Sequence, residues 1–202
     1  MKIGPKYKIA RRLGAAVFEK TSTAKFALKA EKRNAHPNGV RSRSNYGTQL
    51  LEKQKVRYTY GISAKQLTNY VKKVITSKAK EQEATLYKNL ERRLDNVILR
   101  SGLAKTRFQA RQIVSHGHVR VNDKKMKVPS YSVRDKDIIS IKESSREKVL
   151  FLDFKDYFKE VTVPSWLSVD PDKYTVTILG SPQYSSTEIS FNLSDVLQFY
   201  KR

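Results

Sequence analysis

The sequence lacks the residues from which most metal and redox centres are built. None of its 202 residues is cysteine, and only three are histidine. The absence of cysteine excludes disulfide bonds, thiolate zinc sites, iron–sulfur clusters and cysteine catalysis. His116 and His118 alternate, but no carboxylate or cysteine lies at a spacing that would complete a metal shell. We therefore expect no metal and no other cofactor.

Long apolar segments and clustered glycines are also missing. No run of about eighteen apolar residues occurs, and the start, MKIGPKYKIARR, lacks the apolar stretch of a secretory signal. The eight glycines are scattered and form no Gly-rich phosphate loop. We expect a soluble, cytoplasmic protein with no membrane partner and no nucleotide-binding domain.

Acidic residues are scarce relative to basic ones. Lysine and arginine number 41 against 19 aspartates and glutamates, which gives a formal net charge of +22. The charge is +16 over residues 1–89, +8 over 90–148 and −2 over 149–202. No block of five like charges occurs, so the basic residues are expected to decorate folded elements rather than a disordered tail. Nucleic acid is the first partner to consider, because a polyanion would neutralise this excess.

The pattern of apolar and turn-forming residues predicts an α+β fold. Asn45 and Ser63 are candidate N-caps, and Thr106 with Gln109 forms a candidate capping box that precedes a helix ending at Gly117. The expected helices span 8–20, 24–33, 46–60, 64–78, 85–102, 107–116 and 194–202. A further helix is expected to begin at a second capping box, Ser144 with Glu147, and to end at about 161–164. The expected strands span 118–121, 125–128, 137–141, 174–179 and 188–193, with Asn122 and Asp123 turning between the first two.

Two of these helices have one apolar and one polar face. The residues that should form the core of this region are Leu94, Val97, Ile98, Ala110, Ile113, Val114, Val119, Val121, Ile139 and Ile141. The polar faces carry Arg92, Asn96 and Arg100 on one helix, and Arg107, Arg111, Gln112, Ser115 and His116 on the next. Charged helix faces are often simply solvated, but two such faces in a +22 chain favour RNA, whose phosphates accept hydrogen bonds from guanidinium groups. His116 and His118 could donate to phosphate or satisfy the turn.

Several stretches resemble a known family. The run ERRLDNVILRSGLAKTRFQARQIVSHGHVRVNDKKMKVPSYSVRDKDIISI is similar to an RNA-binding module shared by small-subunit ribosomal protein four, certain pseudouridine synthases and tyrosyl-tRNA synthetases. GPKYKIARRLG, YGTQLLEKQKVRYTYGIS, PSWLSVD and FYKR resemble, in the same order, bacterial-type ribosomal protein four. The resemblance spans the whole chain.

This resemblance implies a domain organisation and a role. Residues 1–45 would be a basic arm, 46–91 the helical part of the first domain, 92–152 the inserted RNA-binding module, and 153–202 a C-terminal segment that packs with the helical part. The family binds small-subunit rRNA at a multi-helix junction, acts early in assembly, and contributes with neighbouring ribosomal proteins to the mRNA entry region and decoding accuracy.

The resemblance also assigns residues. Lys6, Lys8, Arg11 and Arg12 match the RNA-binding arm, Lys53, Lys55 and Arg57 match the basic central helix, and Arg107, Arg111, Gln112, Ser115, His116 and His118 match the RNA surface of the module. Tyr7 and Ala10 stand where some members have zinc-binding cysteines, so this is a zinc-free version. The roles of Arg41 and Arg43 stay open, because their stretch is shorter than the family's loop.

Two other function classes compete with a ribosomal role. Pseudouridine synthases use an aspartate in an Arg-Leu-Asp sequence, and Arg93-Leu94-Asp95 is such a triplet. It falls inside a predicted helix with no sizeable catalytic domain after it, so we expect no enzymatic activity. A free RNA chaperone or translational repressor could use the same surface. Sedimentation separates the two, since a ribosomal protein should co-migrate with small subunits after a high-salt wash.

Overall fold

The structure is a computed structural model that describes residues 3–152, 154–159, 161–185 and 189–201, apart from residues 29–43. The chain divides into two compact units. A helical unit contains residues 1–86 and 184–202, and a mixed unit contains residues 87–183. None of the described helices is long and apolar enough to cross a membrane.

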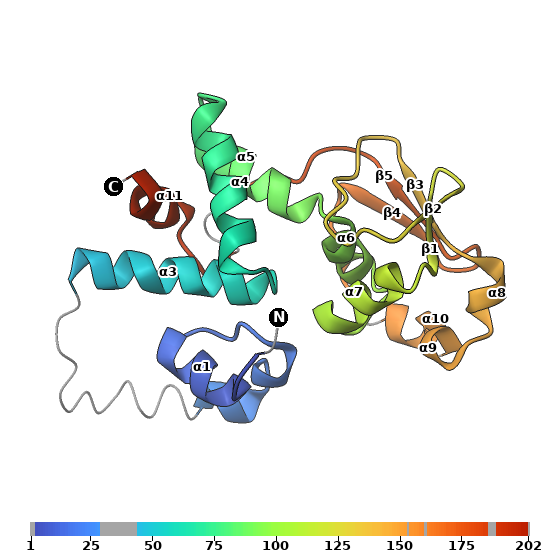
Figure 1. The fold of residues 1–202 in the computed structure, drawn as a ribbon. Coiled ribbons are helices and arrows are strands. Elements are labelled where there is room, and N and C mark those ends of the chain that lie inside the picture. The colour runs from blue at the N-terminus through green and yellow to red at the C-terminus, as the bar shows by residue number, and fades with distance from the viewer. Residues whose placement is uncertain (1–2, 29–43, 153, 160, 186–188, 202) are drawn as a thin grey trace. The chain divides into compact units, whose positions relative to one another are not determined.

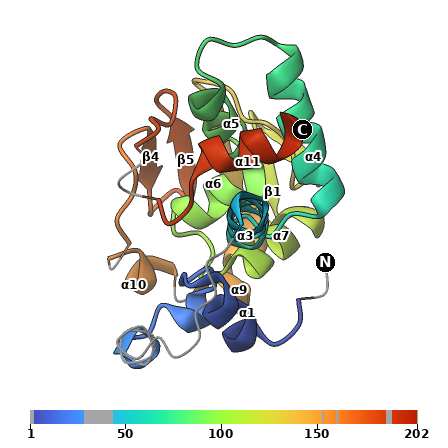
Figure 2. The ribbon, with the colours of Figure 1, turned by 90° about the vertical axis from the view of Figure 1, so that its left-hand side faces the viewer.

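The helical unit is built around three long helices. It contains α3 (Asn45–Thr59), α4 (Ala64–Thr76), the first half of α5 (Gln82–Glu91) and the C-terminal α11 (Leu193–Lys201). The last helix packs along α3 and also contacts α4, so the two ends of the chain share one unit (Figures 1 and 2). Ser63 caps α4 as predicted, whereas α3 is capped by Ser44, one residue before the predicted cap.

The described part of the N-terminal segment folds into helical turns. It forms α1 (Lys6–Leu13), the short 3-10 helix η1 (Glu19–Thr21) and a helical turn at 24–28. These elements enclose a small apolar core with partly buried side chains of α3 at its edge; its buried members are Ala10, Leu13, Val17 and Phe18. The first predicted helical patch, 8–20, is therefore only partly helical, because residues 14–18 separate α1 from η1; of the second, 24–33, the described part is helical. Arg41 and Arg43 lie outside the described residues.

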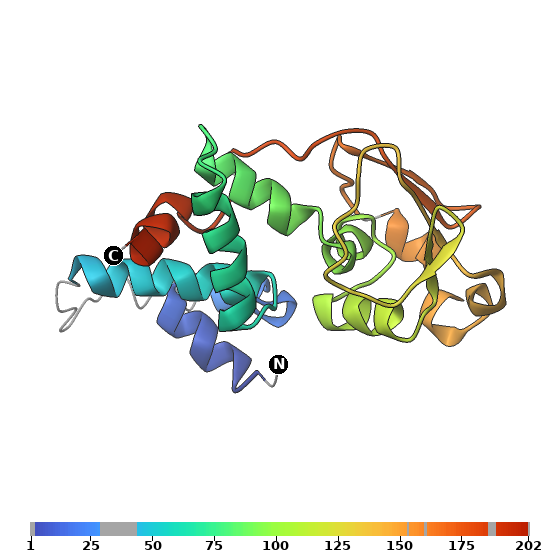
Figure 3. The ribbon, with the colours of Figure 1, turned by 45° about the horizontal axis from the view of Figure 1, so that its top comes forward.

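The mixed unit combines short helices with one antiparallel sheet. Its helices are α6 (Leu94–Arg100), α7 (Arg107–Ser115), α8 (Glu143–Arg146), α9 (Val149–Leu152) and α10 (Phe154–Phe158). Its strands are β1 (Val119–Val121), β2 (Lys124–Met126), β3 (Ile138–Ile141), β4 (Leu167–Asp170) and β5 (Thr175–Ile178). The strand order is β2-β1-β3-β5-β4, with every neighbouring pair antiparallel. Figure 3 shows the ribbon turned so that its top comes forward. The predicted α+β class is confirmed.

The turn between β1 and β2 follows its residue types. Asn122 and Asp123 have φ angles of 48° and 62°, the left-handed conformation that a two-residue hairpin turn of this type needs. The Asn122 amide donates to Asp137 at 2.8 Å and accepts from the Ile138 N–H at 2.9 Å, which ties the turn to the start of β3.

The predicted domain boundary at residue 152 is wrong. Strand β5 pairs with β3, with Ile139 opposite Val176, so the sheet of the module continues into the segment that was expected to pack with the helical part. Of the predicted C-terminal segment 153–202, only residues 184–202 belong to the helical unit. Val176 and Ile178 are buried in the same core as the module's helices, which explains why these strands join it.

Other local predictions also need correction. The expected strand at 188–193 is not formed by its described residues, because Leu193 already begins α11. Strand β4 was not predicted. The helix expected from Ser144 consists of three short helices, and the first of them begins at Glu143 with no side-chain cap.

The long helix predicted over 85–102 is broken. Helix α5 ends at Glu91 and α6 begins at Leu94, while Arg93 is extended, with φ −67° and ψ 135°, and forms a bridge with Ser132. Backbone hydrogen bonds of 2.8 to 3.0 Å join residues 92, 94 and 95 to segment 129–133. These contacts to a distant segment replace the helical hydrogen bonds and turn α6 away from the direction of α5.

The core of the mixed unit contains all ten predicted residues. Each is at most 4% exposed, and they share one cluster with Phe151, Trp166, Val176 and Ile178. The apolar stripes of α6 and α7 therefore share one core with the strands; α7 leaves its polar residues largely outside, whereas Asp95 and Asn96 of α6 are buried as well.

Ile113→Asp should unfold the mixed unit, because an unpaired carboxylate at this fully buried site costs several kcal/mol, comparable with much of a domain's stability. Thermal and urea unfolding measure the change. Gln112→Asp places the same carboxylate on the exposed side of α7 and should leave the melting temperature nearly unchanged. Equal melting of the two variants would contradict the core assignment.

Candidate nucleic-acid interface

The start of α7 is fixed by its cap. The Thr106 hydroxyl accepts from the Gln109 N–H at 3.2 Å, as predicted. The Gln109 side chain, however, accepts from the Lys105 N–H at 2.9 Å rather than from Thr106. One hydrogen bond of the predicted capping box is therefore present, from the Gln109 N–H to the Thr106 hydroxyl. The second is replaced by the bond from the Lys105 N–H, one residue before Thr106, to the Gln109 side chain.

A buried carboxylate on α6 holds two arginines. Asp95 is 4% exposed, and the Arg93 guanidinium donates to its two oxygens at 3.0 and 2.8 Å. Arg111 of α7 donates to the same carboxylate through Nε at 3.1 Å and Nη2 at 2.7 Å. The Arg93 side chain is 2% exposed, but that of Arg111 is 31% exposed. Asp95 thus neutralises an internal guanidinium and orients one that reaches the surface.

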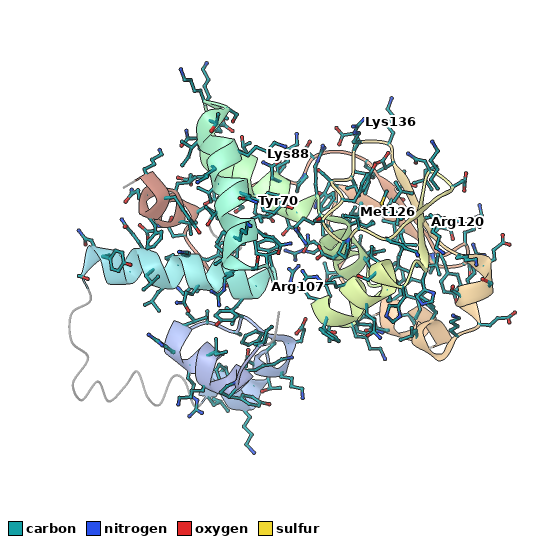
Figure 4. All side chains as sticks on the ribbon, in the orientation of Figure 1. Tyr70, Lys88, Arg107, Arg120, Met126 and Lys136 are labelled. Carbon is teal, nitrogen blue, oxygen red and sulfur yellow. The ribbon has the colours of Figure 1, made fainter. Side chains whose placement is uncertain are left out.

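A second buried carboxylate organises the neighbouring positions. Glu91 is 1% exposed and accepts from Nε and Nη2 of Arg100, both at 3.1 Å. It also accepts from the Asn96 amide at 2.8 Å, and the Asn96 oxygen accepts in turn from Arg107. Glu91 therefore positions Arg100 directly and Arg107 through Asn96 (Figure 4 labels Arg107).

The prediction of an exposed, RNA-facing Asn96 is wrong. Its side chain is fully buried and its amide group is engaged by Glu91 and Arg107. Leu94, Val97 and Ile98 of α6 face the core as predicted, but Glu91 and Arg107 cover the opposite side of the helix and bury Asn96 there. Asn96 links the Glu91 carboxylate to the Arg107 guanidinium and does not form part of the exposed surface.

Arg92 is less accessible than predicted. Its Nη2 donates to Asp135 and, at 2.9 Å, to the Ser181 hydroxyl, and its side chain is only 13% exposed. Arg92 therefore ties the end of α5 to the mixed unit. The structure gives it a clear internal role.

The outer face of α7 and the loop after it contain the remaining predicted residues. Gln112, Ser115 and His116 are exposed. Gly117 has φ 74°, the left-handed conformation predicted for the end of this helix, and a Cβ there would lie 2.5 Å from Cε of Lys125. The glycine thus lets a lysine of β2 approach the backbone beside His116.

His118 is half-buried and surrounded by positive charge. Its Nδ1 lies 2.9 Å from the Ser145 hydroxyl. Burial is the main cause that lowers the pKa of His118 below 6.5, followed by the charges of Lys148, His116, Lys142 and Lys125. The His118 imidazole therefore binds a proton more tightly in the unfolded chain than in the folded one. As a result, the free energy of unfolding of the mixed unit decreases as the pH falls from 6.5 through the folded-state pKa. A phosphate beside this cluster would raise the pKa again.

On the helical unit, α1 presents a basic face. Lys8, Arg11 and Arg12 are exposed, on the side away from the small apolar core. Lys6 is only partly exposed, and its ammonium lies 5.9 Å from the centroid of the Phe18 ring. Three of the four residues assigned to this arm are therefore displayed to solvent, within the described residues.

The basic residues of α3 are engaged inside the helical unit. The Lys53 ammonium lies 4.1 Å from the Phe199 ring centroid, and Lys55 pairs with Glu52 at 2.6 Å. Burial and the charge of Arg57 lower the pKa of Lys53. Arg57 lies over the ring of the following tyrosine at 4.7 Å. All three side chains are partly buried. Lys53 joins α3 to α11, whereas the partners of Lys55 and Arg57 lie within α3 itself; the sequence predicted none of these contacts.

Two residues that organise the interface were not recognised from the sequence. Glu91 and Asp95 lie on either side of the break between α5 and α6, and the sequence pattern marks Asp95 only as part of the Arg-Leu-Asp triplet. The available signal was their position: Glu91 directly precedes Arg92, and Asp95 follows Arg93 by two residues, within a stretch that also supplies core leucines. Charged residues that become buried in such a stretch are expected to form ion pairs. In the part of the chain that the structure describes, no group of three potential ligands could hold a metal ion.

Comparison with known proteins gives consecutive matches along the chain. Residues 1–92 match the model of the ribosomal protein S4/S9 N-terminal domain, and residues 92–139 match that of the S4 domain. The chain is 39% identical to small ribosomal subunit protein uS4 of Aquifex aeolicus, over 99% of this chain and 98% of that protein. It is 38% identical to the protein of the same name from Cutibacterium acnes, over 98% of both chains. The similarity thus extends well beyond the S4 domain.

Asp95→Asn should destabilise the mixed unit by about 3 to 5 kcal/mol, because it leaves the buried Arg93 guanidinium without its counter-charge. Urea unfolding gives the free energy directly. Asp123→Asn makes the same change at an exposed turn position where asparagine adopts the left-handed conformation readily, and should cost less than about 0.5 kcal/mol. Equal stability of the two variants would show that Asp95 is not an internal ion-pair partner.

Proposed function

Because the chain belongs to the family of small ribosomal subunit protein uS4, we propose that it is a non-enzymatic component of the small subunit that binds small-subunit rRNA directly. The observation that carries this proposal is the pairing of surface arginines with buried carboxylates. Arg100, Arg107 and Arg111 are held at defined places by Glu91, Asn96 and Asp95, on the outer side of α6 and α7; these contacts lie within one unit.

Such an arrangement suits phosphate recognition. A guanidinium presents its N–H groups in a rigid planar fork, so fixing one edge of the plane fixes the direction of the others. An arginine that is already ordered loses less side-chain entropy when it binds a phosphate. The neighbouring Gln112 and Ser115 offer amide and hydroxyl groups that can reach sugar edges. The loop with His116 and His118, flanked by lysines, extends the same positive surface.

The helical unit would add a second contact to rRNA. Lys8, Arg11 and Arg12 form an exposed basic face on α1, with the apolar side of the helix packed inward. We infer that this face binds phosphates chiefly by charge. Lys53, Lys55 and Arg57 would contribute to the local positive potential more than to direct contacts, because each has partners within the unit.

The finer parts of the role are inferred from the family. We propose that the chain recognises a multi-helix junction of the rRNA, nucleates small-subunit assembly, and contributes with neighbouring ribosomal proteins to the mRNA entry region and translational accuracy. Its place would be the cytoplasmic ribosome. The rival use as a free regulator would employ the same surface on an mRNA fold.

An enzymatic use of the Arg-Leu-Asp triplet has little support in the geometry. Asp95 is almost fully buried and accepts hydrogen bonds from two guanidinium groups. A nucleophilic or proton-accepting carboxylate must reach a substrate, whereas this one is enclosed by its partners. The observed contacts are those of a structural carboxylate.

The test is the salt dependence of binding to isolated small-subunit rRNA. Arg107→Ala and Arg111→Ala should each weaken binding and lower the slope of log K against log salt by about 0.7 to 0.9, because each removes one phosphate contact. Gln112→Ala should weaken binding with the slope nearly intact, since its amide releases no counterion. Filter binding over a series of salt concentrations measures both quantities.

The control variant is Lys173→Ala. Lys173 belongs to the same unit, and its side chain is 79% exposed beside Asp170, so the substitution removes one charge outside the proposed surface. It should change the affinity and the slope only slightly. Equal losses for Lys173 and the two arginines would mean that binding reflects net charge alone, and would overturn the proposed surface.

A further inference from the structure

Phe108 of α7 has an unusual environment for a phenylalanine. Its side chain is 76% exposed, the highest value among the exposed large apolar residues of the described chain. Folding of the unit does not bury this ring, because the core side of α7 is occupied by Ala110, Ile113 and Val114. Its contribution to stability is therefore small, and its exposure calls for another explanation.

The position of Phe108 on the helix is specific. At about 100° per residue, the buried residues of α7 centre on one side and Phe108 lies almost directly opposite. On this projection it falls between Arg111 and Gln112, about 60° from one and 40° from the other. The ring therefore stands in the middle of the face that we propose for rRNA, so any RNA that contacts Arg111 and Gln112 must also cover it.

The chemistry of this face selects one kind of occupant. A phenyl ring surrounded by ordered arginines and an amide suits a polyanion that also offers an apolar surface, and an unstacked nucleobase beside its own phosphate has both properties. A paired RNA helix presents no exposed base face to such a ring. An apolar protein partner would instead remove water from the partly exposed guanidinium of Arg111. It would offer no acceptor to replace the hydrogen bonds that the guanidinium makes to that water, which is costly.

We propose that Phe108 stacks on an unpaired base of the small-subunit rRNA, at a position where Arg107 and Arg111 hold the adjoining phosphates. This inference rests on the proposed function and adds to it a base contact within the same face. It assigns the centre of the α7 surface to a single-stranded nucleotide of a junction or bulge, rather than to a helical stem.

Three substitutions test the contact in binding to isolated small-subunit rRNA. Phe108→Ala should weaken binding by about five- to 150-fold, the range for loss of one base–aromatic stack, with the salt slope unchanged. Phe108→Tyr keeps the aromatic face and should bind within about twofold of the parent chain. Phe108→Leu keeps apolar area without a π face and should resemble the alanine variant. Thermal melting should be the same for all, since the site is exposed.

A fluorescence measurement distinguishes stacking from simple burial. In Phe108→Trp, addition of rRNA should quench the new indole emission, because stacked bases quench indole strongly. The parent chain supplies the background, since its single tryptophan, Trp166, is buried in the core of the mixed unit. No additional quenching in the variant, under conditions where binding is complete, would overturn the proposal.

The outcomes also separate this inference from the function on which it rests. If Arg111→Ala weakens rRNA binding and Phe108→Ala does not, the RNA surface stands and the stacking contact is rejected. If neither variant changes binding, the proposed function itself fails. If Phe108→Leu binds rRNA as tightly as the parent chain while Phe108→Ala binds more weakly, the ring provides an apolar contact and base stacking is rejected.

Discussion

The carboxylate of Asp95 accepts hydrogen bonds from two guanidinium groups, one inside the mixed unit on Arg93 and one reaching the surface on Arg111. A buried arginine is costly unless its charge is compensated and its N–H groups are bonded. Asp95 meets both needs for Arg93, and the same oxygen that accepts from Arg93 Nη2 fixes Arg111. The internal packing of α6 and the outer face of α7 therefore depend on one group.

This ion pair forms at the break between α5 and α6. With Arg93 extended, its backbone bridges to segment 129–133 and its side chain turns back to the carboxylate two residues later. The break places Glu91 at the end of α5 beside Asn96 in α6, so the second carboxylate can hold Arg100 and, through Asn96, Arg107. Two short polar networks thus position three arginines of one face.

Much of this architecture follows from local sequence patterns. Apolar residues at helical spacing predicted the core side of α7, and Asn122-Asp123 predicted the hairpin, because both signals act within a few residues. The break at Arg93 could not be predicted in this way, since Leu90, Leu94 and Val97 keep helical spacing through it. Its cause is hydrogen bonding to a segment more than thirty residues away.

The same reason limits what the sequence says about the interface. Arg107 and Arg111 were identified as surface residues from the helical period alone. Whether a charged residue is displayed or engaged depends on distant partners, such as Phe199 for Lys53. Asn96 was misplaced for this reason, and the pairing of β3 with β5 was missed because strand order is a non-local property.

On the proposed surface the arginines bind RNA through their fixed geometry and not only through their charge. The most direct measurement is the affinity of Arg111→Lys for small-subunit rRNA, compared with Arg120→Lys on the exposed face of β1. Lysine keeps the charge but cannot bridge Asp95 and a phosphate with one planar fork, so Arg111→Lys should bind about tenfold more weakly, or about 1.4 kcal/mol. Arg120→Lys should bind like the parent chain. Unchanged affinity of Arg111→Lys, in a variant that melts normally, would contradict the account.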